Sequence, residues 1–134
     1  MDALATPAVI IGLVLAFLAG LLHVGFFVME TLLWSRPQVH RIFGVKDPAD
    51  AAVQSRAMAN LGFYNLFLGL GAMAGALAWW WLWIVAVVVY ACLFMVGAAL
   101  VLIGTSRSMW RGALVQGLLP LVALVLLVPV VVPL

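Results

Sequence analysis

The sequence predicts an all-α integral membrane protein in which four transmembrane helices form an up-and-down bundle. Three observations carry this prediction. Apolar residues make up 69% of the 134 positions and charged residues 7%, whereas soluble chains are about 45–50% apolar and about 25% charged. The apolar residues gather in four runs, each long enough to cross a hydrocarbon layer of about 30 Å. All six Lys and Arg residues lie in, or directly beside, two of the connecting segments.

A chain of this length is expected to form one domain, residues 1–134. Its apolar runs predict four membrane spans and two polar loops between them. The spans cover about residues 7–33, 56–78, 82–104 and 112–132, and the polar loops are 34–55 and 105–111.

The first span begins at Pro7, a residue that suits the first helical turn because its missing N–H would have no partner there. The run is longer than the apolar core of a signal peptide and lacks a basic segment before it, so we expect a retained helix. Gly12, Ala16 and Gly20 recur every four residues and predict a smooth ridge against a neighbouring helix. Pro37 is expected to end the helix.

Asp47 followed by Pro48 has the pattern of a helix N-cap and first turn, so a short amphipathic lead-in to the second span is expected there. Gly71 and Gly75 predict close helix contact in that span. A tryptophan cluster (Trp79, Trp80, Trp81 and Trp83) predicts a tight turn at the membrane interface. Pro120 predicts a kink in the fourth span.

The basic residues also predict an orientation. Both polar loops lie on one side of a four-span bundle, and the other side has no Lys or Arg. The positive-inside rule therefore places both loops in the cytoplasm and both termini outside. The same distribution accounts for the basic pI without nucleic-acid binding, and the lipid bilayer is the partner that the composition requires.

Several polar residues lie inside or beside the spans, where an ionisable group needs a partner. His23 and Glu30 are seven residues apart and share a helix face, and Glu30 is placed to pair with Arg56. Arg56, Asn60 and Tyr64 follow at four-residue spacing on one face of the second span, while Asn65 points elsewhere. These groups would act either as structural hydrogen-bond partners or as a functional site formed by their convergence.

Other chemistries are not indicated. Motifs for zinc proteases, nucleotide-binding loops and serine hydrolases are missing, and Cys92 is the only cysteine. His23 and Glu30 alone are too few ligands for a closed metal site, so no metal is expected.

The order His23-x6-Glu30-x3-Trp34-x2-Pro37, then Phe43-Gly44 and Asn60-x-Gly62-x-Tyr64-Asn65, resembles a bacterial family of small membrane proteins known as domain of unknown function 1304. This resemblance extends over nearly the whole chain. It implies four spans, a bacterial cytoplasmic (inner) membrane and no established activity.

A shorter pattern is similar to the membrane-associated eicosanoid and glutathione metabolism superfamily. The second helix of those proteins opens with a motif like Arg56-Ala57-x-x-Asn60, and arginines like Arg107 and Arg111 follow their third helix. That resemblance implies a homotrimer with glutathione as cofactor. The present chain has Gly62, Phe63 and Tyr64 where those proteins place an acidic residue.

The leading hypothesis is a homo-oligomeric membrane protein that binds a small amphiphilic or anionic ligand in a polar pocket near the cytoplasmic leaflet. The alternatives are a membrane-embedded enzyme of glutathione-transferase-like or isomerase type, and a small transporter or assembly factor. His23, Glu30 and Tyr64 are the catalytic candidates. The ligand-binding candidates are Glu30, Arg56, Asn60, Tyr64, Asn65, Arg107 and Arg111.

Overall fold

The computed structural model describes residues 4–132, and every regular element in that part of the chain is helical. The elements in order are α1 (Pro7–Phe27), η2 (Val28–Leu32), α2 (Pro37–Ile42), α3 (Pro48–Leu77), α4 (Leu82–Thr105), η3 (Arg107–Met109) and α5 (Trp110–Val131). Four of the helical segments are long and apolar enough to cross a membrane. The predicted all-α class with four spans is thus confirmed.

Two helices begin with an N-cap residue followed by proline, a pattern that is visible in the sequence. Thr6 caps α1, where its Oγ1 accepts a hydrogen bond from the Val9 N–H at 3.4 Å, and Pro7 occupies the first turn. Asp47 caps α3 in the same way, with Oδ1 accepting from the Ala49 N–H at 2.8 Å. Both caps satisfy backbone donors that a helix start leaves without partners.

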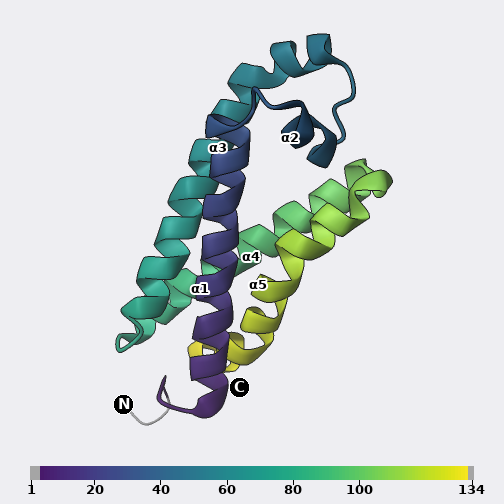
Figure 1. Ribbon diagram of the computed structural model, residues 1–134. Helices are drawn as coiled ribbons and strands as arrows, with labels where there is room; N and C mark the ends of the chain where they lie inside the picture. Colours follow the sequence, from purple (N-terminus) through teal and green to yellow (C-terminus); the bar gives the residue numbers. More distant parts are fainter. Residues whose placement is uncertain (1–3, 133–134) are drawn as a thin grey trace.

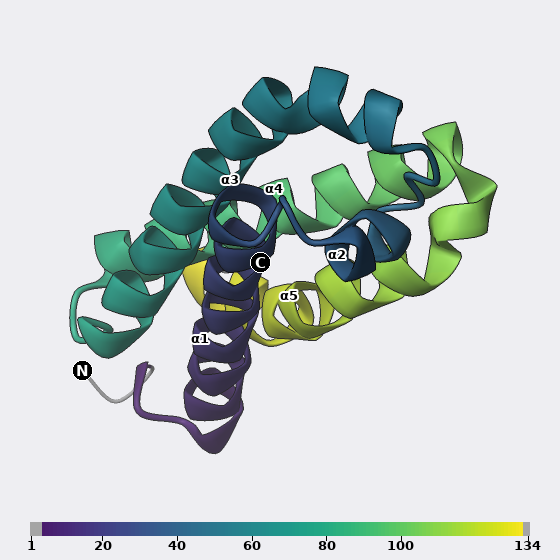
Figure 2. The same cartoon turned by 45° about the horizontal axis from the view of Figure 1, so that its top comes forward.

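The long helices form an up-and-down bundle in which α1 packs against α3 and α5, and α4 packs against α5 and α3. Figure 1 shows that α4 and α5 lean away from α1 and α3 towards one end. The short helix α2 lies at that end, on the side of α1 that faces α4 and α5 (Figures 1 and 2). A Cβ on Gly44, after α2, would lie 3.5 Å from Sδ of Met109.

The polar loop after the first span contains more helix than the sequence predicted. Pro37 begins α2 instead of only ending the preceding helix. The expected lead-in at Pro48 is continuous with the second span, so α3 begins eight residues before the predicted 56. Pro120 lies inside an unbroken α5, and Figure 1 shows this helix changing direction along its length, in agreement with the predicted kink.

Small residues let the helices approach closely, as predicted for α1. A Cβ on Gly12 would lie 2.9 Å from the Leu127 side chain of α5, and one on Gly20 would lie 2.6 Å from the Gly69 carbonyl oxygen of α3. The prediction for α3 was half wrong. Gly75 does face α4, whereas Gly71 faces open space because it lies on the outer side of the helix.

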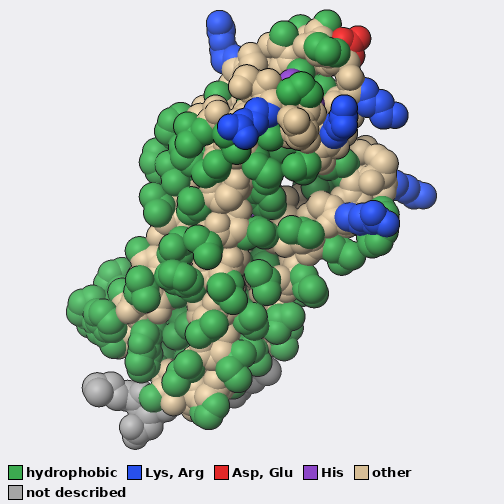
Figure 3. Space-filling view, viewed as in Figure 1, with side chains coloured by type: hydrophobic (Ala, Val, Ile, Leu, Met, Phe, Trp, Pro, Cys, Tyr) green, Lys and Arg blue, Asp and Glu red, His purple; other side chains and the backbone are tan. Residues whose placement is uncertain are grey.

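The two ends of the bundle differ in chemistry. At the end opposite α2, residues 78–81 join α3 to α4 in the predicted tight turn, and the tryptophans there are mostly exposed. At the α2 end, Lys and Arg side chains gather around the loops (Figure 3). All six are exposed, and they are Arg36, Arg41, Lys46, Arg56, Arg107 and Arg111. The sequence prediction that the basic loops share one end of the molecule is therefore confirmed.

Candidate functional site

The first span ends in a widened π-helical turn, η2. Its closing hydrogen bond runs from the Leu33 N–H to the Val28 carbonyl oxygen over five residues, at 2.9 Å. Glu30 lies at the centre of this turn and is only 3% exposed. Single π-helical turns of this kind recur at functional sites in proteins.

The Glu30 carboxyl group is held by the neighbouring span. The Asn65 Nδ2 of α3 donates a hydrogen bond to Glu30 Oε2 at 2.7 Å. Close approach of the two helices depends on Gly62, because a Cβ there would collide with Thr31 Oγ1 and lie 3.3 Å from Glu30 Cβ. The Thr31 hydroxyl donates to the Ala59 carbonyl oxygen at 3.1 Å and fixes the same approach.

The chain beyond η2 folds back over the start of α3. The Trp34 indole N–H donates to the Ala51 carbonyl oxygen at 3.0 Å, and Nε2 of His40 donates to the Trp34 carbonyl oxygen. The His40 and Phe43 rings lie against the Trp34 ring, with centroids 4.9 and 5.7 Å away. Together these contacts place α2 beside the buried Glu30.

A cleft of about 380 Å³ lies between η2, the α2 segment and the first turns of α3. Its lining residues are Glu30, Thr31, Trp34, Ser35, His40, Pro48, Ala51, Ala52 and Ser55. A second hollow, of about 430 Å³, lies between α1 and the far end of α3, and its lining includes Ile10, Phe17 and Leu77. That lining is apolar and suits hydrocarbon, so the cleft at Glu30 is the better candidate for polar chemistry.

Four of the polar side chains that line this cleft share one property. Thr31, Trp34, His40 and Ser55 each donate a proton to a backbone carbonyl oxygen. Glu30 Oε1 makes no hydrogen bond within residues 4–132. The cleft therefore has free acceptors, while most of its donors are already used.

Residues 17–128 match the family described as "Protein of unknown function (DUF1304)". The chain belongs to this family. No curated protein and no solved structure matches it. The DUF1304 description assigns no activity, and the resemblance to the glutathione metabolism superfamily stays a prediction.

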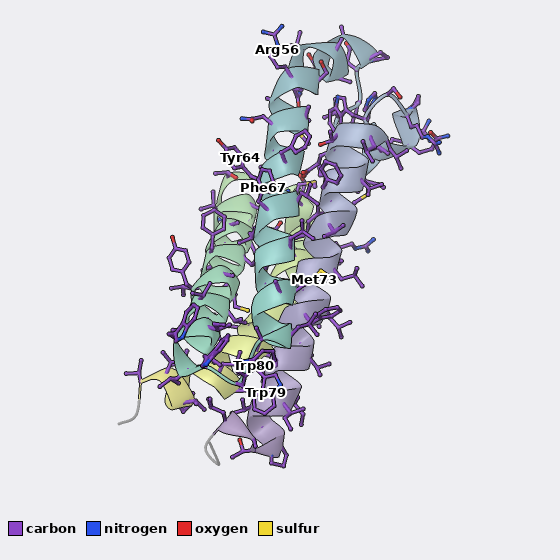
Figure 4. All side chains as sticks on the ribbon, turned by 90° about the vertical axis from the view of Figure 1, so that its left-hand side faces the viewer. Arg56, Tyr64, Phe67, Met73, Trp79 and Trp80 are labelled. Carbon is purple, nitrogen blue, oxygen red and sulfur yellow. The ribbon has the colours of Figure 1, made fainter. Side chains whose placement is uncertain are left out.

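In this DUF1304 member, the predicted ligand-binding residues divide between different surfaces. Glu30 and Asn65 meet at the cleft, but Arg56, Asn60 and Tyr64 lie on the outer face of α3 and are exposed. Figure 4 shows Arg56 and Tyr64 projecting from that helix. The pairing of Glu30 with Arg56 does not form among the described residues, because Asn65 occupies the carboxyl group nine positions further along α3.

The remaining arginine candidates lie at the end of the other helix pair. Arg107 is in η3 and Arg111 is in the first turn of α5, and both are exposed outside the cleft lining. The Arg111 guanidinium lies over the Trp110 ring, 5.3 Å from its centroid, a distance at which a cation is attracted to an aromatic face.

The three catalytic candidates do not share a pocket. His23 is 1% exposed, and its Nδ1 donates to the Ala19 carbonyl oxygen one turn earlier at 2.8 Å. The Phe26 ring packs edge-on against it, with centroids 5.3 Å apart. Tyr64 is 65% exposed on the outer face of α3. Within residues 4–132, no three His, Cys, Asp or Glu side chains are grouped so that they could hold a metal ion.

Three members of the cleft were not predicted from the sequence. Trp34 has the pattern of an interfacial anchor, yet it is buried and hydrogen-bonded. His40 and Ser55 bind backbone carbonyl oxygens, and such contacts leave no spacing pattern in a sequence. The π-helical turn likewise has no residue signature here, although its acid was identified.

Proposed function

We propose that this multi-pass membrane protein binds a small amphiphile, with the polar head of the ligand in the cleft beside Glu30. The observation that carries the proposal is a buried carboxyl group, fixed by Asn65, in the wall of an open cleft. Keeping a carboxyl group at such depth is costly, so intramembrane acids commonly mark a ligand or ion site. The apolar tail would remain in the surrounding bilayer.

The hydrogen bonds of the cleft suggest the chemistry of the head group. Glu30 and Ser55 offer acceptors, whereas the donors of Thr31, Trp34, His40 and Ser55 are directed to backbone carbonyl oxygens. A ligand that brings its own N–H or O–H donors would satisfy these acceptors. An ammonium group fits best, because it carries three donors and a charge opposite to that of a carboxylate.

A negative group on the same ligand would meet the basic rim. Arg36 directly follows the cleft residue Ser35 and is exposed. A phosphate binds well to arginine because the guanidinium fork matches its oxygens. We therefore favour a zwitterionic head group, with an amine in the cleft and a phosphate at the rim.

The orientation that agrees with this proposal puts the α2 end in the cytoplasm of a bacterial inner membrane. The support is the position of all six basic residues at that end. A cysteine introduced at Lys46 in intact cells should react only with membrane-permeant thiol reagents. Labelling of this cysteine by an impermeant reagent would reverse the orientation.

The proposed specificity can be tested with two lysophospholipids of equal chain length. Lyso-phosphatidylethanolamine and lyso-phosphatidylcholine have the same phosphate and the same charge, but only the former has N–H donors. The protein in nanodiscs should bind the ethanolamine lipid about tenfold more tightly, which corresponds to about 1.4 kcal/mol. Native mass spectrometry of competing lipids measures this ratio directly.

Glu30→Gln is the decisive variant, because its amide oxygen can still accept from Asn65 while the ionisable carboxyl group is lost. The preference for the ethanolamine lipid should fall towards unity. Ser108→Ala, in η3 and outside the cleft lining, is the matched control and should keep the preference. Equal binding of the two lipids by the unchanged protein, or a preference that survives Glu30→Gln, would contradict the proposal.

A further inference from the structure

Two basic loops that are far apart in the sequence meet at the α2 end of the bundle. The meeting point joins Gly44, which follows α2, to Met109 in η3, since a Cβ on Gly44 would lie 3.5 Å from Sδ of Met109. Gly44 has a φ of +74°, a left-handed conformation that favours glycine. The chain turns at this glycine, with α2 on one side of the turn and the start of α3 on the other.

Arginines lie beside both partners of this contact. Arg41 is three residues before Gly44, and its carbonyl oxygen accepts a hydrogen bond from the Gly44 N–H at 3.2 Å. Arg107 and Arg111 lie two residues before and two residues after Met109. All three arginines are exposed, and they are called the arginine cluster below. Figure 3 shows basic side chains around both loops on the same side of the molecule.

The charge of the arginine cluster is not neutralised by other side chains of the described residues. No Lys or Arg within residues 4–132 forms an ion pair, and no hydrogen bond joins the two loops there. The exposed acids of this part of the chain are Asp47 and Asp50 at the start of α3, and Asp47 already accepts a hydrogen bond from the Ala49 N–H. Positive charges around one contact repel one another, so an anionic partner would stabilise it.

Trp110 indicates the depth of the cluster in the membrane. Its side chain is 47% exposed, and the Arg111 guanidinium lies 5.3 Å from the ring centroid. Exposed tryptophans prefer the interface where lipid head groups lie, so the cluster lies at the level of lipid phosphates. Leu114, one turn further into α5, is exposed and apolar and suits contact with an acyl chain. A phospholipid is therefore the anion that fits this position.

We propose that the arginine cluster binds a phospholipid that carries two phosphates. One phosphate would meet Arg41 on the α2 loop, and the other would meet Arg107 and Arg111. The guanidinium fork matches phosphate oxygens, and basic pockets between membrane helices bind head groups of this kind. The lipid would join the two helix pairs at the end where Figure 1 shows them leaning apart. The positive-inside rule accounts for the shared side of the basic loops, but not for their meeting at one point.

Lipid competition tests the proposal. The protein is placed in nanodiscs of phosphatidylcholine that also contain cardiolipin and phosphatidylglycerol, with two phosphatidylglycerol molecules for each cardiolipin. Charge and acyl chains are then equal, and only the link between the two phosphates differs. Native mass spectrometry should show cardiolipin enriched on the protein at least about tenfold over the phosphatidylglycerol pair. Equal retention of the two lipids would overturn the proposal.

Charge-removing variants locate the binding site. Arg41→Gln and Arg107→Gln should each lower the enrichment about fivefold, the factor given by about 1 kcal/mol per basic residue at an anionic lipid surface. Arg56→Gln removes the same charge from the outer face of α3 and should keep the enrichment. All three side chains are exposed, so folding is preserved. Equal losses in the three variants would show a diffuse basic surface and would contradict the proposal, as would an enrichment that survives Arg41→Gln or Arg107→Gln.

Hydrogen exchange tests whether the lipid bridges the two loops. Cardiolipin, compared with phosphatidylglycerol, should slow exchange in residues 36–46 and 105–111 together and leave residues 78–81 at the opposite end unchanged. Slower exchange in only one of the two loops would contradict the proposal. None of the three arginines lines the cleft at Glu30. Glu30→Gln should therefore keep the cardiolipin enrichment, and the two binding proposals fail separately.

Discussion

The two helix pairs of this bundle are held together in different ways. Where the first span, α1 with η2, meets α3, glycines bring the backbones together. Side-chain hydrogen bonds also cross from η2, between Asn65 and Glu30 and from Thr31 to the Ala59 carbonyl oxygen. Where α4 meets α5, the contact is also close, since a Cβ on Gly117 would lie 2.8 Å from Ala99 Cβ. However, no side-chain hydrogen bond joins these two helices within residues 4–132.

This difference assigns separate roles to the two pairs. Apolar surface gives little driving force between helices in lipid, so packing and hydrogen bonds decide how helices associate. Among the described residues, the α4–α5 pair is held by packing without side-chain hydrogen bonds. The α1–α3 pair adds polar contacts, and these lie beside the cleft. Variants that remove one kind of contact from one pair therefore test the distinction.

The largest effect is expected where backbone meets backbone. Gly20→Leu should destabilise the protein by about 3 kcal/mol, because its Cβ would lie 2.6 Å from the Gly69 carbonyl oxygen, which cannot rotate away. Reversible unfolding in mixed detergent and SDS micelles measures the loss. Gly25→Leu on the same helix faces open space and should change stability by no more than about 0.5 kcal/mol. If Gly20→Leu and Gly25→Leu lost the same free energy of unfolding, the close approach of α1 to α3 would contribute nothing to stability.

The next largest effect concerns the Glu30–Asn65 hydrogen bond. Glu30→Leu should cost about 2 kcal/mol, because the partly buried Asn65 amide is left without its acceptor. Glu30→Gln should cost less, since its oxygen can accept the same bond. The double variant Glu30→Leu with Asn65→Leu should show a coupling energy of about 1 kcal/mol. Additive losses would show that the bond is not formed in the membrane.

The sequence predicted well those features that depend on composition and on local rules. The positions of Pro7 and Asp47 predicted two helix starts, and the tryptophan cluster predicted the turn before Leu82. Each of these signals depends only on residues close in the chain or on where a segment meets the membrane interface. No knowledge of neighbouring helices was required.

The pairing of residues across helices was predicted less well. Glu30 and Arg56 have opposite charges, but α3 is offset so that Asn65 lies opposite Glu30. Likewise, Gly69 and not Gly71 approaches α1, because the face that α3 turns inward is set by all its contacts together. Such offsets are properties of the whole bundle, so no pattern within one helix reveals them.

A smaller effect is expected from Trp34, whose indole N–H is bonded to the start of α3 beside the cleft. Trp34→Phe keeps an aromatic ring but loses the hydrogen bond to the Ala51 carbonyl oxygen, at a cost of about 1 kcal/mol. Hydrogen exchange should become faster in α2 and the first turns of α3, and should be unchanged in α4 and α5. Trp110→Phe is the matched control, because its indole makes no hydrogen bond within the described residues. Faster exchange throughout the bundle would indicate a general loss of stability instead.

The smallest effect is expected from Gln116 in α5. It belongs to the α4–α5 pair, which has no side-chain hydrogen bonds between its helices within residues 4–132. It is partly buried in α5 and makes no side-chain hydrogen bond within residues 4–132. Gln116→Leu should therefore change the free energy of unfolding by no more than about 0.5 kcal/mol. Asn65→Leu also replaces an amide with leucine, but in α3, and it should cost more than about 1 kcal/mol. Both variants are compared in the same micelles. If the two losses were equal, the α4–α5 pair would also depend on a polar contact, and the division of roles between the pairs would fail.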